Sequence, residues 1–176
     1  RDFEKKICSK LKVKYCLATT SGTMAQYIAM KAMGIKRGDE VITQAFNFVA
    51  TIEAILDCGA IPIITKIDDS LNMCPKDLKK RITKKTKVVI PVHMLGFSAD
   101  IKAIKQICKR NNIFILEDNC EAVGAKYQNK FLGTIGNAGI FSFDHGKNIT
   151  TGEGGAIITD NRKIFKFAKE YYDHGH

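Results

Sequence analysis

The segment 141–155 has the residue types best suited to chemistry. It joins two apolar segments, 138–143 and 156–159, and carries Lys147 among small and polar residues. Continuous apolar segments are typical of buried strands, so Lys147 is expected at the end of a sheet. Loss of water in such a crevice lowers the pKa of a lysine amine and frees it for Schiff-base chemistry. The alternative is a solvated loop lysine, which is the usual situation of this residue type.

A carboxylate closes another apolar segment. Asp118 follows residues 113–117, which read IFILE. Its side chain could hold a sugar hydroxyl, a metal ion or the protonated nitrogen of a heteroaromatic ring. The alternative interpretation is an exposed loop acid or a helix cap.

A third candidate is a phosphate site at the start of a helix. Ser21, Gly22 and Thr23 follow the apolar segment 15–19 and precede the helical pattern 24–33. Free amide groups at a helix start, a glycine that permits close approach and two hydroxyls suit a phosphate. The alternative is a plain N-cap, which serine and threonine supply in many helices.

The apolar pattern predicts an α/β chain in which strands alternate with helices. Strands are expected at residues 15–19, 40–43, 61–65, 87–92, 113–117, 138–143 and 156–159. Helices are expected at residues 24–33, 48–56, 75–82, 99–110 and 164–172, with a turn between short strands at 127–131. Continuously apolar strands are typical of a largely parallel sheet with both faces buried. Because ligands bind beyond the carboxyl ends of strands in open sheets, Lys147, Asp118 and residues 21–23 are expected at one edge.

Composition excludes several classes of protein. The chain has 176 residues, with 28 Lys and Arg against 18 Asp and Glu, and therefore a formal net charge of +10. The hydrophobic share of 45% is globular. No apolar stretch approaches the roughly 18 residues of a membrane helix. The basic runs 79–87 and 102–110 lack the aromatic and glycine residues of nucleic-acid modules, so we interpret them as solvated faces and expect no nucleic-acid partner.

The cysteines and the chain ends give further expectations. The cysteines are Cys8, Cys16, Cys58, Cys74, Cys108 and Cys120. They form no CxxC pair and no zinc-ligand spacing, so we expect free thiols in the cytoplasm and no metal site. Residues 1–10 are charged and helix-like, without the apolar segment of a signal peptide. The chain starts at Arg1 and stops soon after a predicted helix, which we interpret as a piece of a longer protein.

Three segments together resemble a known family. They are SGTMAQYIAMKAMGIKRGDEVITQAFNFVATIEAI, LEDNCEAVGAKY and SFDHGKNITTGEGGAIITD. Their order and spacing resemble the sugar aminotransferases often called the DegT/DnrJ/EryC/StrS family, which are fold-type I enzymes dependent on pyridoxal 5′-phosphate (PLP). The resemblance implies a three-layer α/β/α large domain with a mostly parallel central sheet. It implies that residues 1–176 are an incomplete PLP-binding domain without its C-terminal small domain, and that the full-length protein is a homodimer.

The resemblance also implies roles for single residues. Lys147 falls on the lysine that bonds covalently to PLP, and Asp118 falls on the acid that pairs with the pyridine nitrogen. The implied cofactor-binding positions are Ser21, Gly22, Thr23, Phe48, Asp118, Glu121, Ser142 and Lys147. Among these, Ser142 and the Gly22–Thr23 turn contact phosphate, and Phe48 stacks on the ring. Glu121 lies where the family more often has Gln or His near the ring hydroxyl. His93 matches a recurrent histidine with either a structural or a catalytic role.

The reaction implied by the resemblance is transfer of an amino group from glutamate to a keto-sugar. The sugar is a nucleotide-linked keto-deoxyhexose or a keto-octulosonic acid, used for surface polysaccharide or lipopolysaccharide. Related dehydratases carry His in place of the lysine, so Lys147 argues against that activity. A regulatory homologue without catalysis is a further alternative. A basic nucleic-acid-binding domain would account for the charge and for little else.

Overall fold

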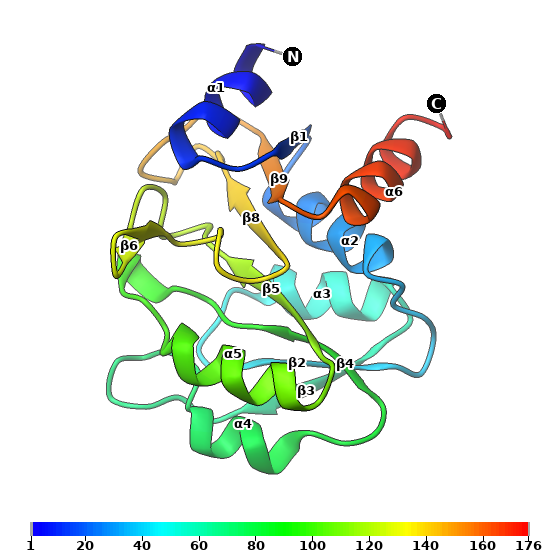
Figure 1. Ribbon diagram of the computed structural model, residues 1–176, viewed down its shortest axis with the longest axis vertical. Helices are drawn as coiled ribbons and strands as arrows, with labels where there is room; N and C mark the ends of the chain where they lie inside the picture. The colour runs from blue at the N-terminus through cyan, green and yellow to red at the C-terminus, as the bar shows by residue number, and fades with distance from the viewer. Residues whose placement is uncertain (1, 176) are drawn as a thin grey trace.

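A seven-stranded sheet forms the centre of the computed structural model, which describes residues 2–175 (Figure 1). The strands are β1 (Tyr15–Thr19), β2 (Glu40–Gln44), β3 (Ile61–Thr65), β4 (Thr86–Ile90), β5 (Phe114–Asp118), β8 (Ala138–Ser142) and β9 (Gly155–Thr159). Their spatial order is β1-β9-β8-β5-β4-β2-β3. Strand β9 runs antiparallel to both neighbours, and the other pairs are parallel. The prediction of a mostly parallel sheet is therefore confirmed.

Helices cover both faces of this sheet. They are α1 (Asp2–Leu11), α2 (Gly22–Ala32), α3 (Val49–Asp57), α4 (Pro75–Arg81), α5 (Ile101–Arg110) and α6 (Arg162–Tyr172). Helices α2, α3 and α6 share one apolar core with the sheet, whereas α4 and α5 pack into a second core on the other face. A short 3-10 helix η1 (Met94–Gly96) and a hairpin of β6 (Lys126–Tyr127) and β7 (Lys130–Phe131) complete the described chain. This is the three-layer α/β/α arrangement that the resemblance implies.

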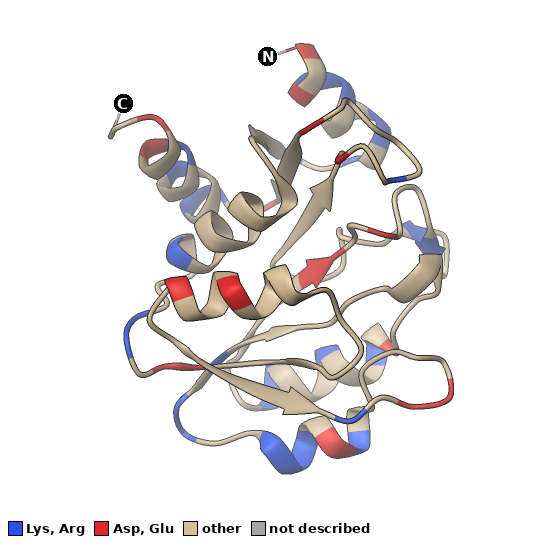
Figure 2. Ribbon diagram, turned by 180° about the vertical axis from the view of Figure 1, so that it is seen from behind, with Lys and Arg blue, Asp and Glu red and all other residues tan. Residues whose placement is uncertain are grey.

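The basic residues of α5 form a solvated face, as predicted. Ile101, Ile104 and Cys108 are buried against the sheet at helical spacing, and Lys102 and Lys109 are exposed. Figure 2 shows lysine and arginine distributed over several helices around the molecule. The positive charge is therefore spread over the helical layers.

Further sequence predictions can be compared with the structure. Strand β4 ends at Ile90, two residues before its predicted end, because Pro91 has no amide hydrogen for the sheet ladder. The helical pattern predicted at 1–10 corresponds to α1, although Arg1 lies outside the described residues. The cysteines are free thiols. No helix within residues 2–175 has both the length and the apolar character needed to cross a membrane.

Candidate active site

The carboxyl ends of the central strands border one cavity of about 440 Å³. Asp118 reaches it from the end of β5, and Lys147 from the loop between β8 and β9. The predicted site residues that line this cavity are Ser21, Gly22, Thr23, Phe48, Asp118, Glu121, Ser142 and Lys147. The structure thus brings these residues together from four separate segments of the chain, whereas His93 is not among the lining residues.

Asp118 is a buried carboxylate held by neutral donors. The residue is only 4% exposed. Oδ1 accepts a hydrogen bond from the Cys120 amide at 3.0 Å, and Oδ2 accepts one from Nε2 of Gln26 at 2.5 Å. The hydroxyl of Thr51 lies 3.5 Å from Oδ2. None of the ion pairs among residues 2–175 involves Asp118, so a bound cation would supply the charge that these donors lack.

Burial raises the pKa of Asp118 above its ordinary value of 3.8, although the Cys120 amide and the charge of Lys147 oppose this effect. The folded state therefore retains a proton at pH values where the unfolded chain has lost it. Consequently the contribution of Asp118 to stability falls as pH rises above 3.8, until the folded group ionises as well.

We expect Asp118→Asn to remove this pH dependence from the cofactor-free protein. Above pH 3.8, the free energy of unfolding should fall more steeply with pH for the wild type than for Asp118→Asn. The difference between the two slopes should reach up to about 1.4 kcal/mol per pH unit for one proton. Denaturant titrations of both proteins at several pH values measure the difference. Parallel pH profiles for the two proteins would contradict this account of Asp118.

Lys147 lines the cavity from the loop between β8 and β9. Its side chain is 24% exposed, and Nζ lies 4.0 Å from Oε1 of Glu121. The other carboxylate oxygen of Glu121 accepts a hydrogen bond from the Leu95 amide at 3.3 Å. Glu121 is thereby tied to η1 and placed beside the lysine. The position predicted to lie near a ring hydroxyl is thus occupied by a carboxylate that pairs with the amine.

The start of α2 combines the features of an N-cap and of an anion site. Oγ of Ser21 accepts a hydrogen bond from the Met24 amide at 3.1 Å, so the plain N-cap interpretation is correct for this side chain. No described hydrogen bond uses the amides of Gly22 and Thr23, which are the first two of the helix. With Ser142 bordering the same part of the cavity, these amides can bind a phosphate.

The close packing at Gly22 leaves no room for a side chain. A Cβ atom there would lie 2.8 Å from Cβ of Ser142 and 3.1 Å from Sγ of Cys120. We expect Gly22→Ala to lower the free energy of unfolding by about 1–3 kcal/mol, the usual cost of overpacking. It should also weaken PLP binding more than binding of pyridoxal, which has no phosphate, in equilibrium dialysis. Equal losses for the two ligands would contradict a phosphate site at this helix start.

Phe48 stands at the rim of the cavity. It is the N-cap residue of α3, and the residue is 71% exposed. Because the ring lines the cavity and has no close packing of its own, it is available to cover a flat heteroaromatic ligand.

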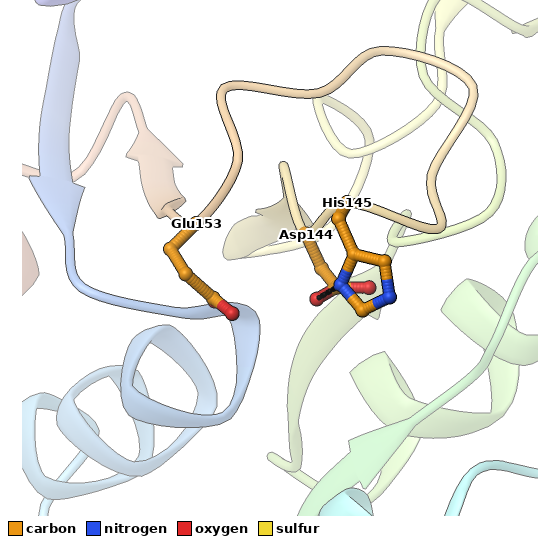
Figure 3. Close-up of side chains that lie close together, drawn as sticks. All are labelled: Asp144, His145 and Glu153. Atoms are coloured by element: carbon orange, nitrogen blue, oxygen red, sulfur yellow. Dashed lines mark hydrogen bonds and ion pairs between the residues drawn. The ribbon is translucent and has the colours of Figure 1, made fainter.

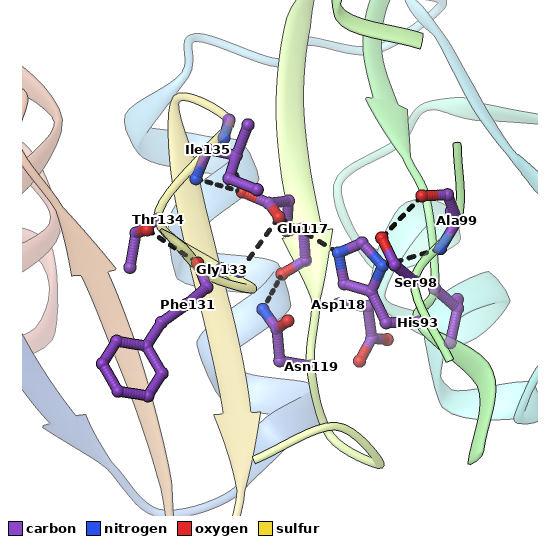
Figure 4. Close-up of polar contacts among 12 residues, drawn as sticks. His93, Ser98, Ala99, Glu117, Asp118, Asn119, Phe131, Gly133, Thr134 and Ile135 are labelled. Atoms are coloured by element: carbon purple, nitrogen blue, oxygen red, sulfur yellow. Dashed lines mark hydrogen bonds and ion pairs between the residues drawn. The ribbon is translucent and has the colours of Figure 1, made fainter. Parts of the chain in front are cut away.

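His93 belongs to a buried network behind the site (Figure 4). Its ring is completely buried, with Nε2 3.0 Å from Glu117 and Nδ1 accepting a hydrogen bond from the Ala99 amide. Glu117 also accepts hydrogen bonds from the amides of Gly133, Ile135 and Gly136. Adjacent residues of a strand point to opposite faces of the sheet. Glu117 therefore anchors the loop 133–136, while Asp118 faces the cavity. Of the two roles predicted for His93, structural and catalytic, its contacts therefore support the structural one.

Three of the residues that line the cavity form a cluster of polar groups (Figure 3). Asp144, His145 and Glu153 present possible metal ligands within 4.8 Å of one another. The Gly146 amide donates to Asp144 at 3.0 Å and lowers the pKa of that carboxyl, and His145 contacts its other oxygen. These local contacts explain the position of Asp144 as part of a turn. The prediction of no metal site stays a prediction.

Sequence reasoning missed the polar side chains around Asp118. Gln26 of α2 and Thr51 of α3 are buried, line the cavity and contact the carboxylate. Asn47 accepts a hydrogen bond from Thr51 at 3.2 Å. The signal was present in the pattern, because Gln26 interrupts the apolar face of its helix. A polar residue on such a face is informative only when it has a buried partner.

The residues present fit PLP. One cavity is lined by a buried carboxylate that has no ion-pair partner among residues 2–175, by an amine and by a helix start with free amides. A protonated pyridine nitrogen would provide the missing positive charge at Asp118. The phosphate would occupy the helix start, and Lys147 would hold the aldehyde carbon.

The order and direction of the strands define the class of fold, which is that of fold-type I PLP-dependent transferases. The chain belongs to the DegT/DnrJ/EryC1/StrS aminotransferase family, whose sequence profile matches residues 1–176. The resemblance found in the sequence is thereby confirmed.

Curated relatives are similar over nearly the whole chain. The GDP-perosamine synthase of Vibrio cholerae is 39% identical over 160 residues, which are 90% of this chain and 44% of that protein. The spore coat polysaccharide biosynthesis protein SpsC of Bacillus subtilis (strain 168) is 40% identical over 93% of this chain and 42% of its own length. A pleiotropic regulatory protein of Geobacillus stearothermophilus is 38% identical over 99% of this chain and 48% of its own length. The chain thus spans less than half the length of these relatives.

Solved structures share the fold. An aminotransferase from Psychrobacter cryohalolentis has a TM-score of 0.97 and 33% identity, over 99% of this chain and 45% of its own. NtdA of Bacillus subtilis with bound cofactor PMP has a TM-score of 0.90 and 35% identity, over 97% of this chain and 39% of its own. A GDP-4-keto-6-deoxymannose-3-dehydratase with a trapped PLP-glutamate geminal diamine has a TM-score of 0.93 and 32% identity, over 99% of this chain and 47% of its own.

Proposed function

We propose that the full-length protein is a PLP-dependent aminotransferase that aminates a keto-sugar. The observation that carries this proposal is the shared cavity, in which Lys147 and Asp118 border the same space as the start of α2. Family membership supports the cofactor, and the synthase named for GDP-perosamine supports a sugar substrate.

When bound, PLP supplies an aldehyde that condenses with amines and a protonated ring that accepts electrons. Lys147 would hold it covalently, and its Nζ, once released and neutral, can take a proton from the α-carbon of an amino donor. Asp118, ionised, would keep the ring nitrogen protonated. The amides at Gly22 and Thr23 would anchor the phosphate, and Phe48 would cover the ring.

The same fold also serves sugar dehydratases and regulatory proteins. The dehydratase structure similar to this chain makes that activity the closest enzymatic alternative. The amine of Lys147 in the cavity favours amino transfer, because the resemblance implies that the related dehydratases have His in place of this lysine. A cavity that retains the lysine, the buried carboxylate and the phosphate site together favours catalysis over a purely regulatory role.

Further parts of the proposal concern the complete protein. We take residues 1–176 to be most of the large domain, with a C-terminal small domain beyond it, since the relatives are more than twice as long. Exposed apolar side chains beside the cavity, Phe48 and Leu95 among them, support burial in a homodimer. Glutamate is the proposed amino donor, and the cytoplasm the proposed location.

The test is amino transfer by the full-length protein. Purified enzyme with PLP and glutamate is given a nucleotide-linked 4-keto-6-deoxyhexose or a keto-octulosonic acid, and the products are identified by mass spectrometry. An amino-sugar together with 2-oxoglutarate is the expected result. Loss of a sugar hydroxyl without gain of nitrogen would instead identify a dehydratase.

A further inference from the structure

Gln26 is a buried polar side chain on an apolar helix face. Its neighbours on α2 that face the core, Ala25, Ile28 and Ala29, are apolar and buried. Gln26 is 3% exposed and reaches the cavity wall beside Asp118. A long amide side chain is costly in such a place unless its polar atoms have partners, so its contacts indicate why it is there.

The amide of Gln26 satisfies Asp118 and leaves its own oxygen without a partner. Nε2 donates to Oδ2 of Asp118 at 2.5 Å and to Oγ1 of Thr51 at 3.1 Å. Oε1 is buried and has no hydrogen-bond partner among the described residues. Turning the amide over would place Oε1 against an ionised carboxylate, which is repulsive. The observed orientation therefore favours the charge on Asp118 at the expense of an unsatisfied acceptor.

Thr51 does not replace Gln26 as a donor to Asp118. Its single hydroxyl hydrogen can be donated once, and Oδ1 of Asn47 at 3.2 Å is nearer than Oδ2 of Asp118 at 3.5 Å. Gln26 is consequently the principal side-chain donor at Oδ2. With the Cys120 amide on Oδ1, both carboxylate oxygens are held and the plane of the carboxylate is fixed.

We propose that Gln26 is a positioning residue that holds the Asp118 carboxylate ionised and oriented toward the ring nitrogen of the cofactor. This inference rests on the proposed function. Its physical basis is that a donor to a buried carboxylate stabilises the charged form against desolvation, and only the charged form can pair with a pyridinium.

The experiment compares two ligands that differ at the ring nitrogen. Wild-type and Gln26→Met full-length proteins are titrated with PLP and with 1-deazapyridoxal 5′-phosphate, in which carbon replaces that nitrogen. Equilibrium dialysis gives the dissociation constants. Gln26→Met should weaken PLP binding by about 10- to 100-fold, as expected for a hydrogen bond to a charged group, and change analogue binding less than about twofold.

Met30→Leu is the matched control, because Met30 is buried on the same helix and does not line the cavity. It should leave both dissociation constants unchanged. If the methionine variant folds poorly, Gln26→Leu removes the amide with a smaller side chain, and melting temperatures identify a folding defect.

The outcomes separate this inference from the proposed function. Equal weakening of both ligands by Gln26→Met would show that Gln26 only supports the cavity wall, and unchanged PLP binding would show that it has no role at the carboxylate. Either result overturns the inference while PLP binding by wild type stands. Failure of wild type to bind PLP would overturn the proposed function and this inference with it.

Discussion

Replacing Lys147 with alanine is expected to abolish turnover and the visible absorption of the PLP-loaded full-length enzyme. The variant loses both covalent attachment of the cofactor and the amine that moves protons. Loss of proton transfer by a positioned side chain alone lowers rates by about 10²- to 10⁴-fold. Absorption spectra and steady-state rates measure the two effects on the same preparation.

Lys102→Ala is the appropriate control for this experiment. Lys102 is an exposed lysine of α5 that is absent from the cavity lining. It should leave both the spectrum and kcat at wild-type values. A Lys147→Ala protein that kept its visible absorption and its activity would refute the assignment of the lysine.

Asp118→Asn has the second largest expected effect. The amide preserves the shape of the side chain but cannot supply the negative charge that keeps a ring nitrogen protonated. Breaking a buried ion pair costs about 3–5 kcal/mol. At 1.36 kcal/mol for each factor of ten, kcat should fall about 10²- to 10⁴-fold, as measured in steady-state assays with saturating PLP.

Asp69→Asn serves as the control, because Asp69 is an exposed loop acid outside the cavity. The melting temperature of the cofactor-free Asp118→Asn protein should not fall below that of wild type at neutral pH, since burial disfavours the charge that the substitution removes. A wild-type kcat in Asp118→Asn would mean that the carboxylate does not face the ring nitrogen.

The strand and helix pattern was predictable because each element buries a distinct apolar face. The continuous run AGIFS of β8 is buried throughout, as expected for a central strand. Element ends were less predictable, because they depend on local hydrogen bonding. Asp100, for example, caps α5 by accepting from the Ala103 amide, so the helix begins later than its apolar pattern.

The candidate site was predictable where chain topology alone decides position. Asp118 is the last residue of β5 and Lys147 follows the neighbouring strand β8, so a parallel sheet must bring them to one edge. The partners of these residues depend on side-chain packing between distant segments. Gln26 meets Asp118 across 92 positions of sequence, and no local pattern specifies that contact.

The position of His93 also depends on packing that its sequence position does not specify. Because it follows an apolar strand, His93 could be expected to line the site. Its ring instead contacts Glu117, whose side chain points away from the cavity on β5. Glu117 and Asp118 are adjacent, yet one contacts His93 and the loop 133–136 while the other contacts α2. The side chain of His93 therefore belongs to the network behind the cavity.

The most direct test of the central claim is to locate the lysine that PLP modifies. The full-length protein is loaded with PLP, reduced with borohydride, digested and sequenced by mass spectrometry. We expect borohydride to bleach the yellow colour and to leave a pyridoxyl group on Lys147. A pyridoxyl group confined to other lysines, or no stable modification at all, would contradict the assignment of this cavity as the active site.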